Sequence, residues 1–214
     1  MLENILFDLG GVLLNLDMGK TRSAFAQLGW KEEDWKGINR NGYLIFEKLE
    51  IGLDSPAQFR EEIRKILPSN PADSEIDHAW NAMLINFPSE IVDYLIKLRS
   101  RYRLYLLSNT NELHVQRFSE IFGQSYGYSI SRIFEKCYYS HEIGFRKPDP
   151  EAFTYVLKDA SLDPGKTLFV DDLKNNTDTA ARLGMMTLHI EAGTLMKRLP
   201  EYLTSSAPST HHSL

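Results

Sequence analysis

The sequence ILFDLGGVLL, residues 5–14, decides how the rest of this chain is interpreted. An apolar run leads into one carboxylate, Asp8, and then into two glycines. A short apolar run that ends in Asp and Gly is typical of a buried strand that delivers a side chain to a loop. In open α/β sheets, ligands bind just outside the carboxyl ends of the strands. The stretch therefore predicts that Asp8 lies at the functional edge of a sheet.

Length and composition predict one large domain, or one core with a smaller insertion, because the chain has 214 residues, 43% hydrophobic and 25% charged. The net charge is −5 and no dense run of Lys and Arg occurs, so nucleic acid is not an expected partner. No segment has the pattern of a signal peptide or a membrane span, and a cytoplasmic protein without membrane contact is expected. The single cysteine, Cys137, is expected to be a buried, unreactive thiol. We expect a monomer or a weak homodimer.

Residues 18–84 are predicted to be helical, because their apolar residues recur at helical spacing and no strand pattern competes. Ser55 and Pro56 are predicted to open one of these helices as N-cap and first helical residue. The expected apolar stripes are Ala24, Phe25 and Leu28; Leu44, Ile45 and Leu49; Phe59, Ile63, Ile66 and Leu67; and Ile76, Ala79, Trp80 and Met83. Trp30, Trp35 and Trp80 all fall here, and a helical core is favoured over ligand contact for them.

From Pro88 onward, strand and helix patterns alternate, which predicts a parallel sheet with right-handed crossovers. The expected strands are 102–107, 136–140, 167–170 and 186–190, and the expected helices are 91–98, 113–122, 150–157 and 175–183. The opening strand needs the same sheet, so the helical segment is interpreted as an insertion. The predicted division is a core of residues 1–16 and 86–204, a helical insertion of residues 17–85, and a disordered polar tail of residues 205–214.

Polar groups follow several of the predicted strands. Ser108, Asn109 and Thr110 follow one strand, Asp171 and Asp172 follow another, and the loop after a third contains Arg146, Lys147 and Pro148. Each group has a local explanation, since Ser, Asn and Asp often cap helices. Their coincidence at successive strand ends favours a shared site with Asp8.

Three carboxylates at one place repel each other unless a cation lies between them. Oxygen ligands without His or Cys suit Mg²⁺ better than Zn²⁺. Ser108 and Lys147 could hold the oxygens of a phosphoryl group, and a carboxylate can attack phosphorus directly. The residues therefore predict Mg²⁺-dependent phosphoryl transfer through an aspartyl-phosphate on Asp8.

These motifs, in this order, resemble the haloacid dehalogenase-like hydrolase superfamily. The resemblance implies an α/β fold, a Rossmann-like three-layer core with a parallel sheet, and a small all-helical cap. It implies Mg²⁺ as cofactor, with Asp8, Gly10 (through its carbonyl), Asp171 and Asp172 as ligands. Asp8 would be the nucleophile, with Ser108 and Lys147 beside it in catalysis, and the phosphate would be bound by Gly10, Gly11, Ser108, Asn109 and Lys147.

One position departs from the superfamily pattern. Phosphatases of this kind usually carry a second Asp two residues after the nucleophile, as general acid and base, and this chain has Gly10 there. The Asp-Leu-Gly opening resembles bacterial sugar-phosphate phosphatases, notably α-D-glucose-1-phosphate phosphatases, which implies a small phosphorylated metabolite, a sugar phosphate, as substrate. The alternatives are a 2-haloacid dehalogenase-type hydrolase, which needs no metal, and a binding or regulatory protein with low turnover.

Overall fold

The computed structural model describes residues 1–31 and 43–205 of the chain. Its centre is a parallel sheet of five strands in the order β5-β4-β1-β6-β7. The strands are β1 (Asn4–Phe7), β4 (Arg103–Ser108), β5 (Lys136–Tyr139), β6 (Thr167–Asp171) and β7 (Met186–His189). The first strand of the chain is thus the central strand of the sheet. The predicted α/β class and Rossmann-like core are confirmed.

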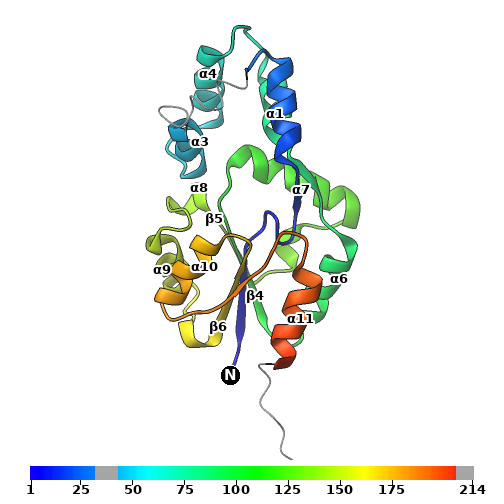
Figure 1. The fold of residues 1–214 in the computed structure, drawn as a ribbon, viewed down its shortest axis with the longest axis vertical. Helices are drawn as coiled ribbons and strands as arrows, with labels where there is room; N and C mark the ends of the chain where they lie inside the picture. The colour runs from blue at the N-terminus through cyan, green and yellow to red at the C-terminus, as the bar shows by residue number, and fades with distance from the viewer. Residues whose placement is uncertain (32–42, 206–214) are drawn as a thin grey trace, which may run out of the picture.

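Helices cover both faces of this sheet, as Figure 1 shows. One face is covered by α6 (Ser89–Leu98), α7 (Glu112–Tyr126) and α11 (Leu195–Ser205), and the other by α9 (Pro150–Asp159) and α10 (Lys174–Arg182). Strand β1 contributes Ile5 and Phe7 to the first face and Leu6 to the second, because successive side chains of a strand alternate. A strand that is apolar on both sides is typical of a parallel sheet covered on both faces.

The register of the sheet sets the position of Asp8. Phe7 lies opposite Leu106 of β4 and Val170 of β6, and the Asp8 amide donates to the Val170 carbonyl at 2.9 Å. Asp8 therefore leaves the sheet at its centre, between the ends of β4 and β6.

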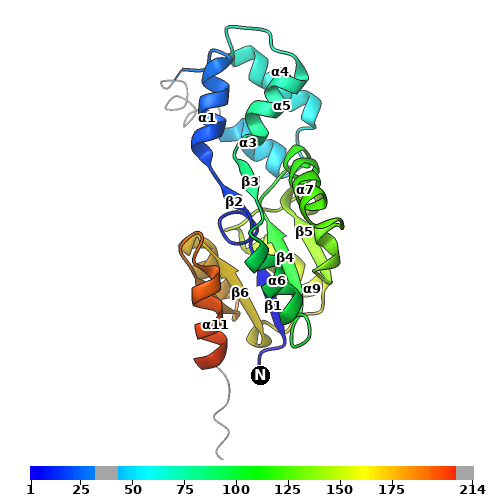
Figure 2. The same ribbon diagram turned by 90° about the vertical axis from the view of Figure 1, so that its right-hand side faces the viewer.

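In the described part of the chain, four further helices lie beyond this edge of the sheet (Figures 1 and 2). They are α1 (Met18–Gln27), α3 (Tyr43–Glu50), α4 (Pro56–Ile66) and α5 (Asp73–Asn81). Ser55 caps α4 as predicted, in a reciprocal capping box with Gln58. Trp30 and Trp80 are buried, as expected for core residues, and Trp35 lies outside the described residues.

The structure differs from the expected elements in several places. A two-stranded antiparallel ribbon, β2 (Asn15–Leu16) with β3 (Leu84–Asn86), joins these helices to the sheet region. The sequence predicts an extended stretch at residues 13–17 but neither β3 nor the pairing. These strands are too short to show a period of two. Ile66 was predicted to be part of a buried stripe, and it is 39% exposed. Ser140 was assigned to a strand but begins α8 (Ser140–Ile143).

The end of the chain also differs. Helix α11 was not predicted, although its Leu195, Leu199 and Leu203 are buried against the core. Ser205 is the last residue of this helix, and the remainder of the predicted tail lies outside the described residues. Within residues 1–31 and 43–205, no helix has both the length and the apolar character needed to cross a membrane.

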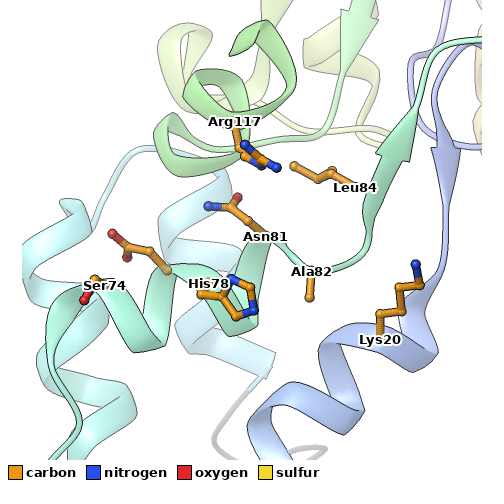
Figure 3. A pocket seen from close by; sticks show the side chains of 8 residues that line it. Lys20, Ser74, His78, Asn81, Ala82, Leu84 and Arg117 are labelled. Carbon is orange, nitrogen blue, oxygen red and sulfur yellow. The ribbon is translucent and has the colours of Figure 1, made fainter. Parts of the chain in front are cut away.

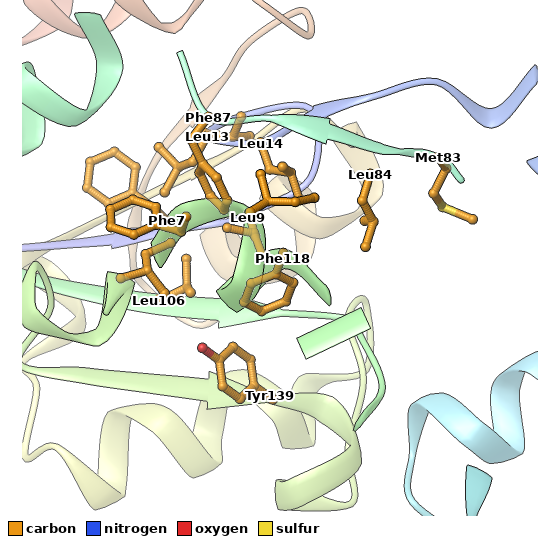
Figure 4. Packing of buried hydrophobic residues seen from close by; sticks show 14 of the residues in the cluster. Phe7, Leu9, Leu13, Leu14, Met83, Leu84, Phe87, Leu106, Phe118 and Tyr139 are labelled. Carbon is orange, nitrogen blue, oxygen red and sulfur yellow. The ribbon is translucent and has the colours of Figure 1, made fainter. Parts of the chain in front are cut away.

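The loop after β1 is held by apolar packing (Figure 4). Leu9, Leu13 and Leu14 are almost completely buried and belong to the same cluster as Phe118 and Leu84. The amides of Leu13 and Leu14 both donate to the Leu9 carbonyl, which closes the loop on itself. Burial of this kind fixes the backbone that follows Asp8.

Candidate active site

The centre of the candidate site is an ion triad of residues far apart in sequence. Lys147 Nζ lies 2.6 Å from Asp8 Oδ1 and 2.8 Å from Asp171 Oδ2. The Lys147 side chain is 1% exposed, and those of Asp8 and Asp171 are 13% and 0% exposed. Such burial is tolerated for charged groups only when they are paired. Of the side chains expected to meet at the strand ends, Asp8, Lys147 and Asp171 are in direct contact there.

The Asp171 carboxylate has more hydrogen-bond partners than the carboxylates of Asp8 and Asp172. Besides Lys147, its carboxylate accepts from the Leu173 amide at 2.7 Å and from Asn176 Nδ2 at 3.0 and 3.1 Å. Both carboxylate oxygens are therefore already engaged. This arrangement orients Lys147 and leaves Asp171 less free to bind another group than Asp8 or Asp172.

Asp172 completes an acidic cluster. One carboxylate oxygen each from Asp8, Asp171 and Asp172 can be chosen so that all lie within 4.8 Å of one another. Gly11 makes this approach possible, because a β-carbon at that position, where φ is +73°, would collide with Asp172 Oδ2. The donors are all oxygens, which is the set that a hard divalent cation such as Mg²⁺ prefers.

Burial and charge shift the protonation of these groups. Burial raises the pKa of Asp8 to about 7, with Lys147 opposing the rise and Asp171 adding to it. Burial also raises the pKa of Asp172. For Lys147, burial disfavours the charge, but the two carboxylates outweigh it and hold the ammonium pKa above its usual value. A cation in the cluster would oppose the rise in pKa that burial causes at Asp8 and Asp172, because it favours the charged carboxylates.

The loop after β4 is tied to the other loops of the site. Asn109 accepts from the Lys147 amide at 2.8 Å and donates to the Lys147 carbonyl at 2.7 Å, so its side chain positions Lys147. Ser140 Oγ bonds both the amide and the carbonyl of Thr110 at 2.9 Å. Asn109 was predicted to bind phosphate; its amide makes one bond from Nδ2 and one to Oδ1, both with the Lys147 backbone, and its phosphate binding stays a prediction. Ser140 was missed because nothing in its sequence context distinguishes it from a strand residue.

Gly10 lies in the wall of the site, and no described residue donates a hydrogen bond to its carbonyl oxygen. A β-carbon at this position would lie 2.7 Å from Leu16 Cδ1. Leu16 is 40% exposed, so its side chain has room to move. The place where a longer side chain at position 10 would begin is thus partly filled by Leu16.

Beside Gly10 and Ser108 lies a cavity of about 200 Å³, between the sheet edge and helices α1, α3 and α5. This volume is below the roughly 300–1,000 Å³ of cavities that hold drug-sized ligands. Most of the lining is apolar, from Leu9, Leu14, Leu16, Met18, Trp80, Met83, Leu84 and Phe118. Trp80 therefore serves both the core and the cavity wall. Its ring stacks between Phe46 and His114, with centroids 4.7 and 4.6 Å away.

The cavity also brings in residues that the sequence did not single out, Glu50 and His114. Glu50 lies three residues after Glu47, so both share a face of α3. Both carboxylates form ion pairs with Arg146, Glu47 at 2.7 Å and Glu50 at 3.1 Å. The Glu47 side chain remains 33% exposed, so it lies at the surface with its carboxylate paired to Arg146.

A larger groove of about 610 Å³ lies elsewhere, between α1, α5, β3 and α7. Figure 3 shows Lys20, His78, Asn81 and Arg117 around it. Asp77, one of its lining residues, is already paired with Arg60 at 2.8 Å. Asp8, Asp171 and Asp172 line neither cavity. The smaller cavity is assigned to the candidate site because Leu9 and Gly10, which follow Asp8, and Ser108 and Asn109, at the end of β4, line it.

The ordered strand-end motifs and their convergence match a known family. The family model described as haloacid dehalogenase-like hydrolase matches residues 2–184. The chain belongs to the haloacid dehalogenase-like hydrolases. The resemblance inferred from the sequence is confirmed.

Several relatives are similar to this chain in sequence and in structure over most of its length. A D-ribitol-5-phosphate phosphatase of Bacteroides thetaiotaomicron is 33% identical over 193 residues, which is 90% of this chain and 94% of that one. A haloacid dehalogenase family enzyme of the same organism, solved as a magnesium complex, has a TM-score of 0.84 and 39% identity over 90% of this chain and 94% of that one. A predicted family hydrolase from Porphyromonas gingivalis has a TM-score of 0.86 and 32% identity over 97% and 100% of the two chains.

Proposed function

We propose that this protein is a Mg²⁺-dependent phosphatase that hydrolyses a small phosphorylated metabolite, a sugar or sugar-alcohol phosphate. The observation that carries the proposal is the triad of Asp8, Lys147 and Asp171 beside Asp172 at the end of the central strand. The name of the 33% identical relative, a D-ribitol-5-phosphate phosphatase, supports the substrate class. The magnesium complex of a 39% identical structure supports the cofactor.

In this proposal Asp8 attacks the phosphorus atom and the ester oxygen leaves with the electron pair of the broken bond. Water then cleaves the aspartyl-phosphate, releasing phosphate and restoring the carboxylate. Lys147 binds the phosphoryl oxygens, together with Ser108 and the backbone of Gly11. Asn109 holds Lys147 in place through the hydrogen bonds described above.

The Mg²⁺ ligands in this proposal are Asp8, Asp172 and the Gly10 carbonyl, with Asp171 assisting. The oxygen donors and their close approach fit such an ion. When bound, the ion neutralises charge on the phosphoryl group and on the clustered carboxylates.

We propose the same division into domains that the sequence suggests, a core of residues 1–16 and 86–204 and a helical cap of residues 17–85. The proposed connection is the β2–β3 ribbon, whose strands lie at the two boundaries. We also propose that the chain works as a monomer or a weak homodimer.

The proposal is tested by measuring phosphate release from sugar phosphates, sugar-alcohol phosphates, nucleotides and acyl phosphates, with Mg²⁺ or with EDTA. We expect phosphate release from a sugar or sugar-alcohol phosphate when Mg²⁺ is present and none in EDTA. The Asp8→Asn variant should release no phosphate under either condition. Turnover of a 2-haloacid that EDTA leaves unchanged would instead favour a dehalogenase. A defluorinating L-2-haloacid dehalogenase is 17% identical with a TM-score of 0.61, which indicates a shared fold alone.

A further inference from the structure

An ion cluster joins the loop of Lys147 to helix α3. Arg146, the residue before Lys147, places Nη1 at 2.7 Å from Glu47 Oε1 and Nη2 at 3.1 Å from Glu50 Oε2. The three side chains are only 22%, 33% and 21% exposed. Because the charges are partly shielded from water, the cluster holds the end of α3 beside the site.

The two glutamates differ in what else they reach. Glu50 lines the 200 Å³ cavity beside Gly10 and Ser108, and Glu47 does not. Among the residues that the structure describes, Glu50 is the only charged side chain in the cavity lining. Its ion pair uses Oε2, and no described residue donates a hydrogen bond to Oε1.

The other polar side chains of the lining have less to offer a ligand. The Asn109 amide is committed to the Lys147 backbone. The distance from His114 Nε2 to the Trp80 carbonyl oxygen is 3.3 Å. Because a carbonyl oxygen can only accept, Nε2 is the donor of this hydrogen bond. Trp80 adds a buried indole N–H to which no described residue offers an acceptor. Apart from these groups and the side chains of Ser108 and Thr110, the lining is apolar with one carboxylate in it. Such a surface suits a short carbon chain with hydroxyl groups on one side.

We propose that Glu50 is the specificity-determining residue of this site, and that its free carboxylate oxygen accepts hydrogen bonds from the hydroxyl groups of a polyol leaving group. This inference rests on the proposed phosphatase function and narrows its substrate class. A carboxylate accepts and does not donate, so it selects hydroxyl-bearing chains over plain alkyl chains. It also repels a second anionic group, so phosphorylated hydroxy acids are disfavoured. Arg146 is a positioning residue that keeps Glu50 at the cavity wall.

The experiment compares kcat/KM for ribitol 5-phosphate, pentyl phosphate and 4-nitrophenyl phosphate in the wild type, Glu50→Gln and Glu47→Gln. The wild type should prefer ribitol 5-phosphate to pentyl phosphate. In Glu50→Gln the ratio of ribitol 5-phosphate to 4-nitrophenyl phosphate should fall roughly tenfold, because the amide oxygen still accepts but lacks the charge that strengthens the hydrogen bond. Glu47→Gln is the matched control, because it removes the charge of an Arg146 partner that lies outside the cavity. Its ratio of kcat/KM for ribitol 5-phosphate to that for 4-nitrophenyl phosphate should stay within about threefold of the wild-type ratio.

Equal ratios in both variants would overturn the proposal and leave Glu50 as a structural partner of Arg146 only. A wild-type preference for pentyl phosphate would overturn it without any variant, so the test does not depend on the folding of Glu50→Gln. Failure of the proposed function looks different, because then no phosphate ester, including 4-nitrophenyl phosphate, is hydrolysed. As a second readout, Glu50→Gln should increase the relative rate on a phosphorylated hydroxy acid, and an unchanged rate counts against the repulsion.

Discussion

Lys147 Nζ lies 2.6 Å from Asp8 Oδ1, although 139 positions separate the two residues in the chain. The ammonium group is also 2.8 Å from Asp171 Oδ2, so a single cation balances two buried carboxylates. Removal of Asp8's charge leaves Lys147 paired, whereas removal of the ammonium leaves both carboxylates unpaired. The two ends of this contact should therefore respond differently to mutation.

We expect Asp8→Asn to abolish phosphate release with a modest loss of stability, and Lys147→Met to abolish it with a loss of about 3–5 kcal/mol, as for a broken buried ion pair. Urea unfolding in EDTA measures the stabilities. Lys136→Met is the matched control, because Lys136 pairs with Asp159 at 2.7 Å on the surface, and its cost should stay below about 1 kcal/mol. Equal losses for Asp8→Asn and Lys147→Met would contradict this account.

We expect slow hydrolysis of the aspartyl-phosphate, because Gly10 has no side chain that could activate water. A pre-steady-state burst of the leaving group is expected in the wild type. A general acid and base contributes about 10²–10⁴-fold, so an aspartate here should raise turnover. Because Leu16 Cδ1 lies 2.7 Å from the place of a β-carbon at position 10, Gly10→Asp alone should gain less than Gly10→Asp with Leu16→Ala. A linear time course in the wild type, with no gain in the double variant, would show that another residue already supplies this chemistry.

Mg²⁺ should stabilise the fold through the acidic cluster. At about 100 times its Kd, a ligand that binds only the folded chain adds about 2.7 kcal/mol, or roughly 5–10 °C in Tm for a chain of this length. Thermal unfolding with and without Mg²⁺ measures this shift, which should be lost in Asp172→Asn. Asp178→Asn is the control, since Asp178 pairs with Lys174 on α10 outside the cluster. An undiminished shift in Asp172→Asn would exclude Asp172 as a ligand.

His114 should make stability depend on pH. Burial lowers its pKa from 6.5 to about 4, so the unfolded chain binds a proton between these values and the folded chain does not. The stability that neutral His114 supports is fully present above about pH 6.5 and is lost as pH falls toward 4. Between pH 7.5 and 5 the expected loss from this group is about 2 kcal/mol. Urea unfolding of the wild type and His114→Gln should show a smaller pH dependence in the variant, and equal slopes would contradict the assignment.

The sequence carries the order of the strand-end motifs, and this was enough to predict the family, the parallel sheet and the candidate site residues. Apolar runs that end in polar residues indicate both the strand and the point where its chain leaves the core. Asp8, Ser108, Asp171 and Asp172 all follow or close such runs. The capping box at Ser55 is similarly local, because its partners are three residues apart.

Short or contact-dependent features were not predictable in this way. The β2–β3 ribbon has strands of two and three residues, in which no period can be recognised. Ser140 and Asn109 act through hydrogen bonds to backbone groups about 30 or more positions away. Helix α11 depends on burial of Leu195, Leu199 and Leu203 against the core, and its internal Pro200 weakens the helical signal.

The stretch at residues 5–14 by itself determined that one carboxylate leaves a buried strand on a glycine turn, because alternation and turn chemistry are local properties. Only the tertiary structure decided what surrounds that carboxylate. Lys147 balances Asp8, Leu16 fills the space beside Gly10, and Glu50 enters the cavity wall with Arg146 as its partner. The physical reason is that electrostatic pairing and cavity shape depend on distances between side chains, which folding sets and sequence spacing does not express.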